Sequence, residues 1–197
     1  PMNYPLQLNF KIFTFAPQIR VTDSSGLLRF YVKQKLFKMK ETIGVFADAD
    51  QVEKIFDIKA DRIIDFSARY NFTNAAGTGL GAVKRKGMKS LFRAHFEIME
   101  EGAEAPVMTI RETNPISRFL DGLFSQLPII GMLSGYLFHP TYSVTRTDGT
   151  EVMTMKKLPA FFEGKFAVDK VGEMSDPEET NVLLSLLMMI LLERSRG

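Results

Sequence analysis

Basic side chains are the residues best suited to chemistry in this chain. They fall in two short stretches, and each stretch holds two lysines two positions apart, which places both on one face of a strand. Clustered ammonium and guanidinium groups can meet phosphates or acidic lipid headgroups. If the two stretches occupied neighbouring strands, their lysine pairs would form one cationic patch. The candidate headgroup ligands are Lys84, Arg85, Lys86, Lys89, Lys33 and Lys35.

The net charge of the chain narrows the partners that these cations could have. Lys and Arg number 25 and Asp and Glu number 23, which gives a net charge of +2. That balance does not indicate nucleic-acid binding, and no aromatic stacking platform for single strands lies near the cluster. Two interpretations of the basic cluster remain: an ordinary solvated strand face, and a binding site for anionic phospholipid or phosphoinositide. Nucleic acid is the least favoured partner.

Residues for catalysis or cofactor binding are few. Cysteine is absent, which excludes disulfides, thiol catalysis and cysteine-ligated metals. His95 and His139 are too few for a multi-histidine metal site, and His95, next to charged residues, is expected to form surface ion pairs. The glycine-rich stretch 77–90 lacks nucleotide-loop spacing, because Lys84 stands where a dinucleotide fingerprint needs Gly or Ala. We expect no catalytic residue, no metal and no cofactor.

Alternation of apolar and polar residues predicts β-strands along most of the chain. The N-terminal residues 1–27, which alternate over 6–15, are expected to form a strand or an apolar arm, and they lack the unbroken apolar core of a signal peptide. The clearest strand patterns lie at 28–37, 64–72, 92–99 and 162–169, and weaker ones at 43–47, 52–58, 82–85, 107–111, 142–146 and 152–156.

One helix is predicted over residues 178–196. Ser175-Asp-Pro177 can supply its cap and first turn. Its centre, Val182–Leu192, is apolar apart from Ser185, so it must be surrounded on every side. At about 1.5 Å per residue this centre spans roughly 16 Å, about half of a bilayer core. A buried core helix is the favoured interpretation, and a membrane-inserted tail and a partner-binding helix are the alternatives.

A second apolar segment, Asn114–Pro140, is punctuated by Gly and Pro and breaks the strand pattern. Asn114 and Pro115 predict the start of a short helix, and an apolar loop is expected after it. Packing of this segment over one end of the domain is favoured over contact with a membrane.

About ten half-apolar strands followed by one apolar helix predict a mainly β, single domain over residues 1–197. A closed antiparallel β-barrel puts one face of every strand inside and leaves no exposed sheet edge. Its interior could hold a helix where side chains from the strands alone do not fill it. We therefore expect a closed antiparallel barrel that encloses the apolar C-terminal helix.

Several short motifs occur along the chain in a characteristic order. They are Tyr31–Lys38, Ile64–Tyr70, Leu80–Ser90, Asn114-Pro115, Pro128–Gly131, Gly135-Tyr136, Pro140–Tyr142 and Glu193–Gly197. In these motifs the chain resembles the LURP-one-related family, which shares its fold with the tubby C-terminal domain and the phospholipid scramblases. The resemblance covers the chain from about Leu28 to its end, and it implies twelve strands around a central helix.

The resemblance implies less about function than about fold. Tubby domains bind membrane phosphoinositides and scramblases act at membranes, but this chain lacks the transmembrane span and palmitoylation segment of scramblases. We expect a non-enzymatic, tubby-like binding module at a membrane surface or on another protein, with anionic phospholipid as the candidate ligand. The alternatives are an enzyme or carrier with a small apolar ligand in a barrel-end pocket, and a purely structural protein. The expected location is cytoplasmic, with peripheral membrane attachment.

Overall fold

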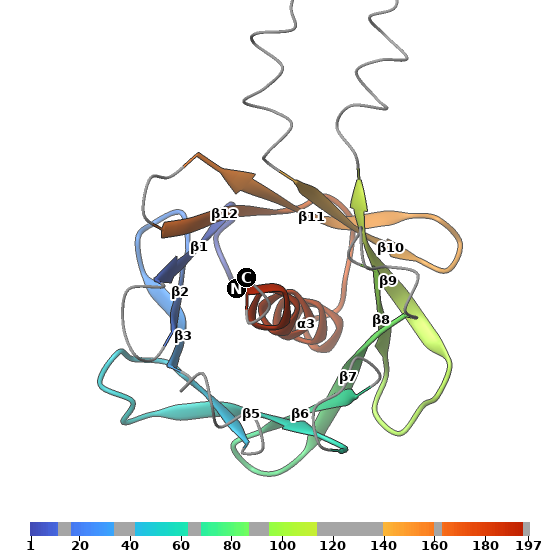
Figure 1. Cartoon of the computed structure of the whole chain (residues 1–197), viewed down its shortest axis with the longest axis horizontal. Coiled ribbons are helices and arrows are strands. Elements are labelled where there is room, and N and C mark those ends of the chain that lie inside the picture. Colours follow the sequence, from blue (N-terminus) through green and yellow to red (C-terminus); the bar gives the residue numbers. More distant parts are fainter. Residues whose placement is uncertain are drawn as a thin grey trace, which may run out of the picture.

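Among the residues that it describes, the computed structural model has twelve β-strands that surround one helix (Figure 1). The structure describes residues 1–11, 17–33, 42–62, 68–86, 95–113, 140–159 and 163–194. Within them the strands are β1 (Leu6–Lys11), β2 (Gln18–Thr22), β3 (Leu28–Lys33), β4 (Ile43–Phe46), β5 (Lys54–Ala60), β6 (Arg69–Asn74), β7 (Gly79–Arg85), β8 (His95–Met99), β9 (Pro106–Thr113), β10 (Thr141–Arg146), β11 (Glu151–Leu158) and β12 (Glu163–Lys170). The helix is α3 (Asp176–Arg194).

The strands form a meander that closes on itself. Each strand pairs antiparallel with the strands before and after it in the sequence, and β1 pairs with β12 to complete the barrel. The junction between β3 and β4 has the shortest ladder, with the single register pair Tyr31 and Phe46. Closure pairs every strand on both sides, which removes exposed sheet edges. The predicted closed antiparallel barrel with a helix inside it is confirmed.

The observed strands overlap every stretch that alternation predicted. One strand, β2, was not predicted separately, because it lies within the segment 1–27 that was expected to form a strand or an apolar arm. Its two inward residues, Ile19 and Val21, alternate with polar and charged residues over only five positions, which is too short for a clear periodic signal. The apolar segment Asn114–Pro140 lies outside the described residues apart from Pro140.

Helix α3 begins with a reciprocal cap. The Ser175 hydroxyl accepts a hydrogen bond from the Glu178 amide at 3.4 Å, and the Glu178 carboxylate accepts one from the Ser175 amide at 2.9 Å. This capping box satisfies two backbone donors, those of Glu178 and Ser175. Acidic residues in the first turn, Asp176, Glu178 and Glu179, face the positive end of the helix dipole.

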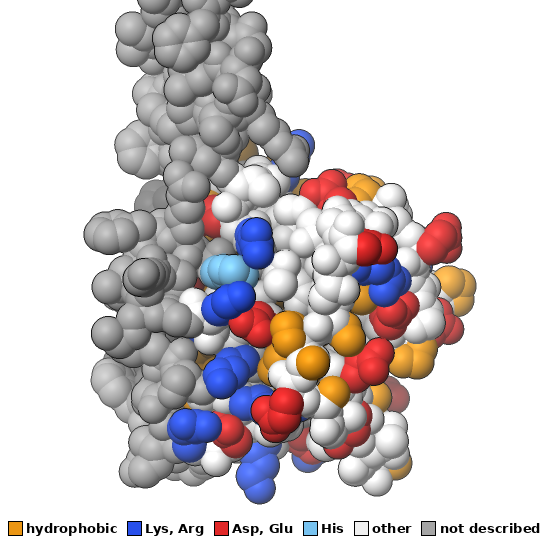
Figure 2. Space-filling model, turned by 90° about the vertical axis from the view of Figure 1, so that its right-hand side faces the viewer, with side chains coloured by type: hydrophobic (Ala, Val, Ile, Leu, Met, Phe, Trp, Pro, Cys, Tyr) orange, Lys and Arg blue, Asp and Glu red, His pale blue; other side chains and the backbone are white. Residues whose placement is uncertain are grey.

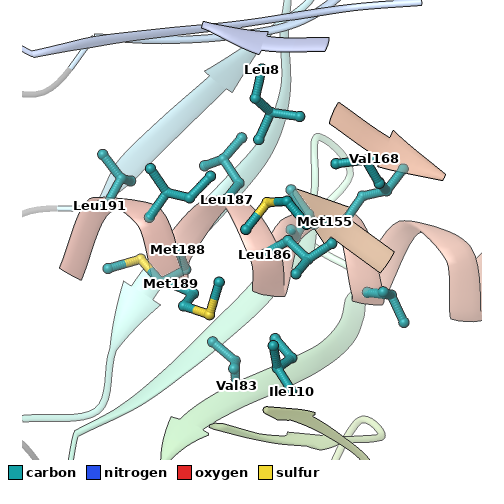
Figure 3. Close-up of a cluster of buried hydrophobic side chains, with 14 of the residues drawn as sticks. Leu8, Val83, Ile110, Met155, Val168, Leu186, Leu187, Met188, Met189 and Leu191 are labelled. Carbon is teal, nitrogen blue, oxygen red and sulfur yellow. The ribbon is translucent and has the colours of Figure 1, made fainter. Parts of the chain in front are cut away.

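The helix is the core of the barrel. Every residue from Asn181 to Leu191 is buried, and the side chains around α3 point toward strands on different sides of the barrel (Figure 3). Full burial of a Leu or Met side chain stabilises the folded state by about 1.5–3 kcal/mol. Burial of a helix that is apolar on every side is therefore a large part of the driving force for folding. Ser185, the one polar residue of the predicted apolar centre, donates its hydroxyl to the Asn181 carbonyl at 2.7 Å.

Candidate functional site

Helix α3 gives the barrel two distinguishable ends. It begins beside the tight turns that connect β2 to β3, β6 to β7 and β10 to β11. It ends beside Arg85, the last residue of β7. We call the first the acidic end and the second the basic end, because the described side chains at the two ends carry opposite charge.

Exposed carboxylates gather at the acidic end, on the turns and the adjoining strand residues. The one exposed cationic side chain there is that of Lys54, among the residues that the structure describes. The exposed carboxylates are Asp50, Glu53, Glu100, Glu101, Glu104, Asp148, Asp169, Glu173 and Asp176.

Exposed cations gather at the basic end, on the strand residues that reach it. Among the residues whose side chains the structure describes, the one exposed carboxylate there is Asp61, and it is paired with Arg62 at 3.2 Å. The exposed cations are Lys11, Lys33, Lys59, Arg62, Lys84, Lys86, Arg111 and Lys156. They come from strands all around the barrel, so the basic end as a whole presents positive charge.

The face in Figure 2 displays this separation. Blue side chains gather on the side where the histidine lies, and red side chains predominate on the opposite side. Of the two histidines in the sequence, His95 is the one within the described residues.

At the basic end a row is formed by Lys86, which directly follows β7, His95 of β8 and Arg111 of β9. The Lys86 amide donates to the His95 carbonyl at 2.9 Å, and His95 is the register partner of Arg111. Residues opposite each other in an antiparallel pair have Cβ atoms about 4.5–5.5 Å apart. The row therefore places two cations on either side of one imidazole.

The surroundings of His95 disfavour its protonated form. Partial burial, followed by the positive charges of Arg111 and Lys86, lowers the pKa of the imidazole below its usual 6.5, and Glu97 opposes them. Its Nε2 atom is buried and makes no hydrogen bond to any described residue. Glu97 itself lies 3.7 Å from the Lys86 ammonium, so it partly neutralises that cation.

The prediction that Arg85 lies on the cationic face is wrong. Its side chain is 7% exposed and turns into the barrel, where Nη1 lies 3.0 Å from Glu193 Oε1 at the end of α3. The guanidinium also lies 5.7 Å from the centre of the Phe96 ring. Successive strand residues alternate between faces, so Arg85 shares the inner face with Val83, while Lys84 and Lys86 share the outer one.

The condition for one joint patch of the two lysine stretches, that they occupy neighbouring strands, is not met. Strands β4, β5 and β6 separate β3 from β7 around the barrel, so Lys33 and Lys84 stand on different sides of it. Both are exposed. Lys35 and Lys89 lie outside the described residues. Arg111 was not predicted as a companion of Lys86, although it ends the stretch 107–111 that was predicted to be a strand.

Within the described residues, no group of three His, Asp or Glu side chains is placed to hold a metal ion. No helix in the described part of the chain has the length and apolarity needed to cross a membrane. The chemistry that the basic end offers is the binding of anions by lysine and arginine side chains.

Comparisons with known proteins agree with this architecture. The family described as LURP-one-related matches residues 28–126. A protein from Arabidopsis thaliana, whose X-ray structure is known, superposes with a TM-score of 0.52 at 13% identity, over 98% of this chain and 92% of its own. At that identity the likeness concerns the fold alone. No curated protein matches the sequence significantly.

Proposed function

We propose that this chain, which belongs to the LURP-one-related family, is a non-enzymatic binding module that places the basic end of its barrel against the anionic phospholipid headgroups of a membrane surface. The tubby-like fold of the family fits a binding role, and the site chemistry described above fits an anionic ligand. The proposal assigns the headgroup contacts to exposed cations of the basic end, Lys84, Lys86 and Arg111 among them.

The separation of charge between the two ends carries the proposal. Each basic side chain near an anionic membrane contributes about 1 kcal/mol, so several together support measurable attachment. The carboxylates of the acidic end are repelled by the same surface. Attraction of the basic end and repulsion of the acidic end favour the same orientation, with the basic end toward the membrane. Attachment therefore has a defined orientation although the net charge of the chain is only +2.

The filling of the barrel favours a surface site over an interior one. A carrier or enzyme for a small apolar ligand would need space along the barrel axis. Leu184, Leu186 and Met188 of α3 are at most 1% exposed and belong to one hydrophobic cluster with the inward side chains of the strands. Figure 3 shows Leu186 and Met188 within this cluster. The helix thus takes the place that such a ligand would use in other barrels.

Co-sedimentation with vesicles tests the proposal. Vesicles of phosphatidylcholine with and without phosphatidylglycerol are compared at low and physiological salt. We expect binding to the anionic vesicles alone and weaker binding at the higher salt, because exposed charges are screened beyond about 8 Å at physiological ionic strength.

A charge-matched pair of variants separates position from net charge. Lys84→Gln/Lys86→Gln removes two cations from the basic end, and Arg29→Gln/Lys54→Gln removes two from the acidic end. The first pair should weaken binding about 10-fold or more, and the second should leave it nearly unchanged. Equal losses in both variants, or equal binding to neutral vesicles, would contradict the proposal. Failure to bind any vesicle would favour a protein partner.

A further inference from the structure

We infer that the barrel opens locally at the junction between β3 and β4, which we call the seam, while α3 and the rest of the wall keep their places. Opening at the seam separates two strands of the closed sheet and exposes the apolar interior without global unfolding. The seam is thus a conformational device built into the fold, and the inference does not depend on the proposed function.

Backbone pairing provides the first argument. The ladder at the seam has the single register pair Tyr31 and Phe46, whereas each of the other junctions has at least four register pairs. Phe46 is the last residue of β4, on the side of the acidic end. The part of the seam nearer the basic end, which includes Val32 and Val45, has no register pair among the described residues. Strands with few ladder bonds separate more easily than fully paired ones.

The attachment of α3 provides the second argument. The helix backbone lies closest to β6, β7 and β8. Two of its polar contacts lie on the same part of the wall: Asn181 bonds the Met99 carbonyl of β8 at 3.0 Å, and Glu193 pairs with Arg85 of β7 at 3.0 Å. Strands β3 and β4 can therefore separate without moving α3 from its place in the barrel.

Each side of the seam is tied to its own neighbouring strand. On one side β3 pairs with β2, and the Arg20 guanidinium of β2 lies 5.7 Å from the centre of the Tyr31 ring. On the other side β4 pairs with β5, and the Phe46 ring lies over Gly44 of its own strand, where an added Cβ would be 2.8 Å from it. Opening at the seam therefore separates two paired units, β2 with β3 and β4 with β5.

Apolar contacts on the inner face hold the seam closed. Phe30 of β3 meets Phe56 of β5 edge to face, with ring centres 5.8 Å apart, so this contact crosses the seam. Val32 and Val45, one on each side, are both 0% exposed and belong to the hydrophobic core. Closure by a few apolar side chains is weaker than closure by a full ladder together with such side chains.

Thiol labelling tests the seam, because the chain has no cysteine of its own. Four valines that are 0% exposed are replaced singly. The seam variants are Val32→Cys and Val45→Cys, and the matched controls are Val83→Cys on β7 and Val144→Cys on β10. A buried thiol reacts with a water-soluble disulfide reagent when its surroundings open, so the labelling rate measures the population of the open state. Urea unfolding of each variant supplies its global stability for comparison.

We expect the two seam thiols to react at least about 10-fold faster than the two control thiols in the absence of urea. Their labelling rates should rise weakly with urea below the unfolding transition, because a local opening exposes little surface, whereas the control rates should follow global unfolding. Equal rates in all four variants, or seam rates that depend on urea as steeply as the control rates, would overturn the inference.

A second substitution tests the aromatic contact across the seam. Phe30→Leu, added to Val45→Cys, removes the ring from β3 while the thiol reports from β4. Labelling should become roughly fivefold faster after allowance for the change in global stability. Phe96→Leu, at a buried phenylalanine of β8, is the control and should speed labelling of the same thiol through global stability alone. Equal effects of the two substitutions would overturn the inference. Neither experiment uses a membrane, so its outcome leaves the proposed function to be tested separately.

Discussion

The Asn181 side chain donates from Nδ2 to the Met99 carbonyl at 3.0 Å, and this bond joins α3 to β8 across the barrel interior. The contact needs Gly81 beside it on β7. A Cβ atom at Gly81 would lie 2.2 Å from Asn181 Nδ2 and 2.7 Å from the Met99 carbonyl oxygen, and the residue has a φ of 137°. The glycine therefore lets the helix approach the strand closely.

Replacement of Gly81 should show the cost of that approach. We expect Gly81→Ala to lower the free energy of unfolding by at least about 2 kcal/mol, because it combines backbone strain with overpacking against a backbone oxygen. Urea unfolding measures the change. The matched control is Gly77→Ala, whose φ is 83° but whose added Cβ meets nothing within 4 Å. Equal losses in the two variants would reject the packing role of Gly81.

The helix core offers a second test. Leu187 is 1% exposed, and Leu187→Ala should cost about 2–5 kcal/mol through lost burial and a new cavity. Leu27→Ala, at a leucine that is 55% exposed, is the control and should change stability by less than about 0.5 kcal/mol. Leu187→Asp should prevent folding, since it buries an unpaired charge. A cooperatively melting Leu187→Asp protein would contradict the central position of α3.

The cap of α3 should make stability depend on pH in acid. Arg146 holds the Glu178 carboxylate with two contacts, at 2.7 and 3.2 Å. The bond to Arg146, with that from the Ser175 amide, lowers the pKa of Glu178 from 4.5 to about 2. A folded-state pKa below the unfolded value gives stability that is complete above pH 4.5 and lost as the pH falls toward 2.

The variant Glu178→Gln measures this contribution. At pH 7 it should cost about 1 kcal/mol relative to the wild type, and the difference should shrink between pH 4.5 and 2. Urea unfolding at several pH values checks it. Glu173→Gln, at an exposed carboxylate of the same end, is the control. A difference that stays constant from pH 7 to pH 2.5 would show that the charge of Glu178 is not responsible.

Arg85, the last residue of β7, and Lys86, which follows it, lie on opposite faces of the barrel wall and should respond in opposite ways. Arg85→Gln leaves Glu193 without its buried partner and should cost about 3 kcal/mol of stability, while vesicle binding by the folded protein is unchanged. Lys86→Gln should weaken vesicle binding and leave the free energy of unfolding within about 0.5 kcal/mol. Thermal unfolding and co-sedimentation on both variants decide this. If folded Arg85→Gln lost vesicle binding, Arg85 would have to be counted among the headgroup ligands.

Most of the fold could be predicted because its two signals are local. Strand alternation and the all-round apolar centre of α3 are visible in short windows of sequence, and together they require a closed sheet around a helix. The Ser175 cap was visible for the same reason. Strand β2 was not predicted separately, because it has five residues and only Ile19 and Val21 face the interior. That pattern is too short to recognise.

The candidate site was harder to predict because it depends on strand order and register. Arg85 was assigned to the same cluster as Lys84 and Lys86 because it lies between them in the sequence. Strand alternation places its side chain on the inner face with Val83. Arg111 and Lys86 come together only through β8, which lies between their strands. The charge separation between the ends likewise requires the meander, since neither end is continuous in sequence.

The orientation of the barrel on an anionic vesicle tests the central claim most directly. The chain has no cysteine, so a single label can be placed by Thr42→Cys at the basic end or by Thr147→Cys at the acidic end, both exposed positions. Fluorescence of each label is measured on phosphatidylglycerol vesicles that carry a lipid-attached quencher. We predict strong quenching at position 42 and little at position 147. Equal quenching, or stronger quenching at position 147, would contradict the claim that the basic end faces the membrane.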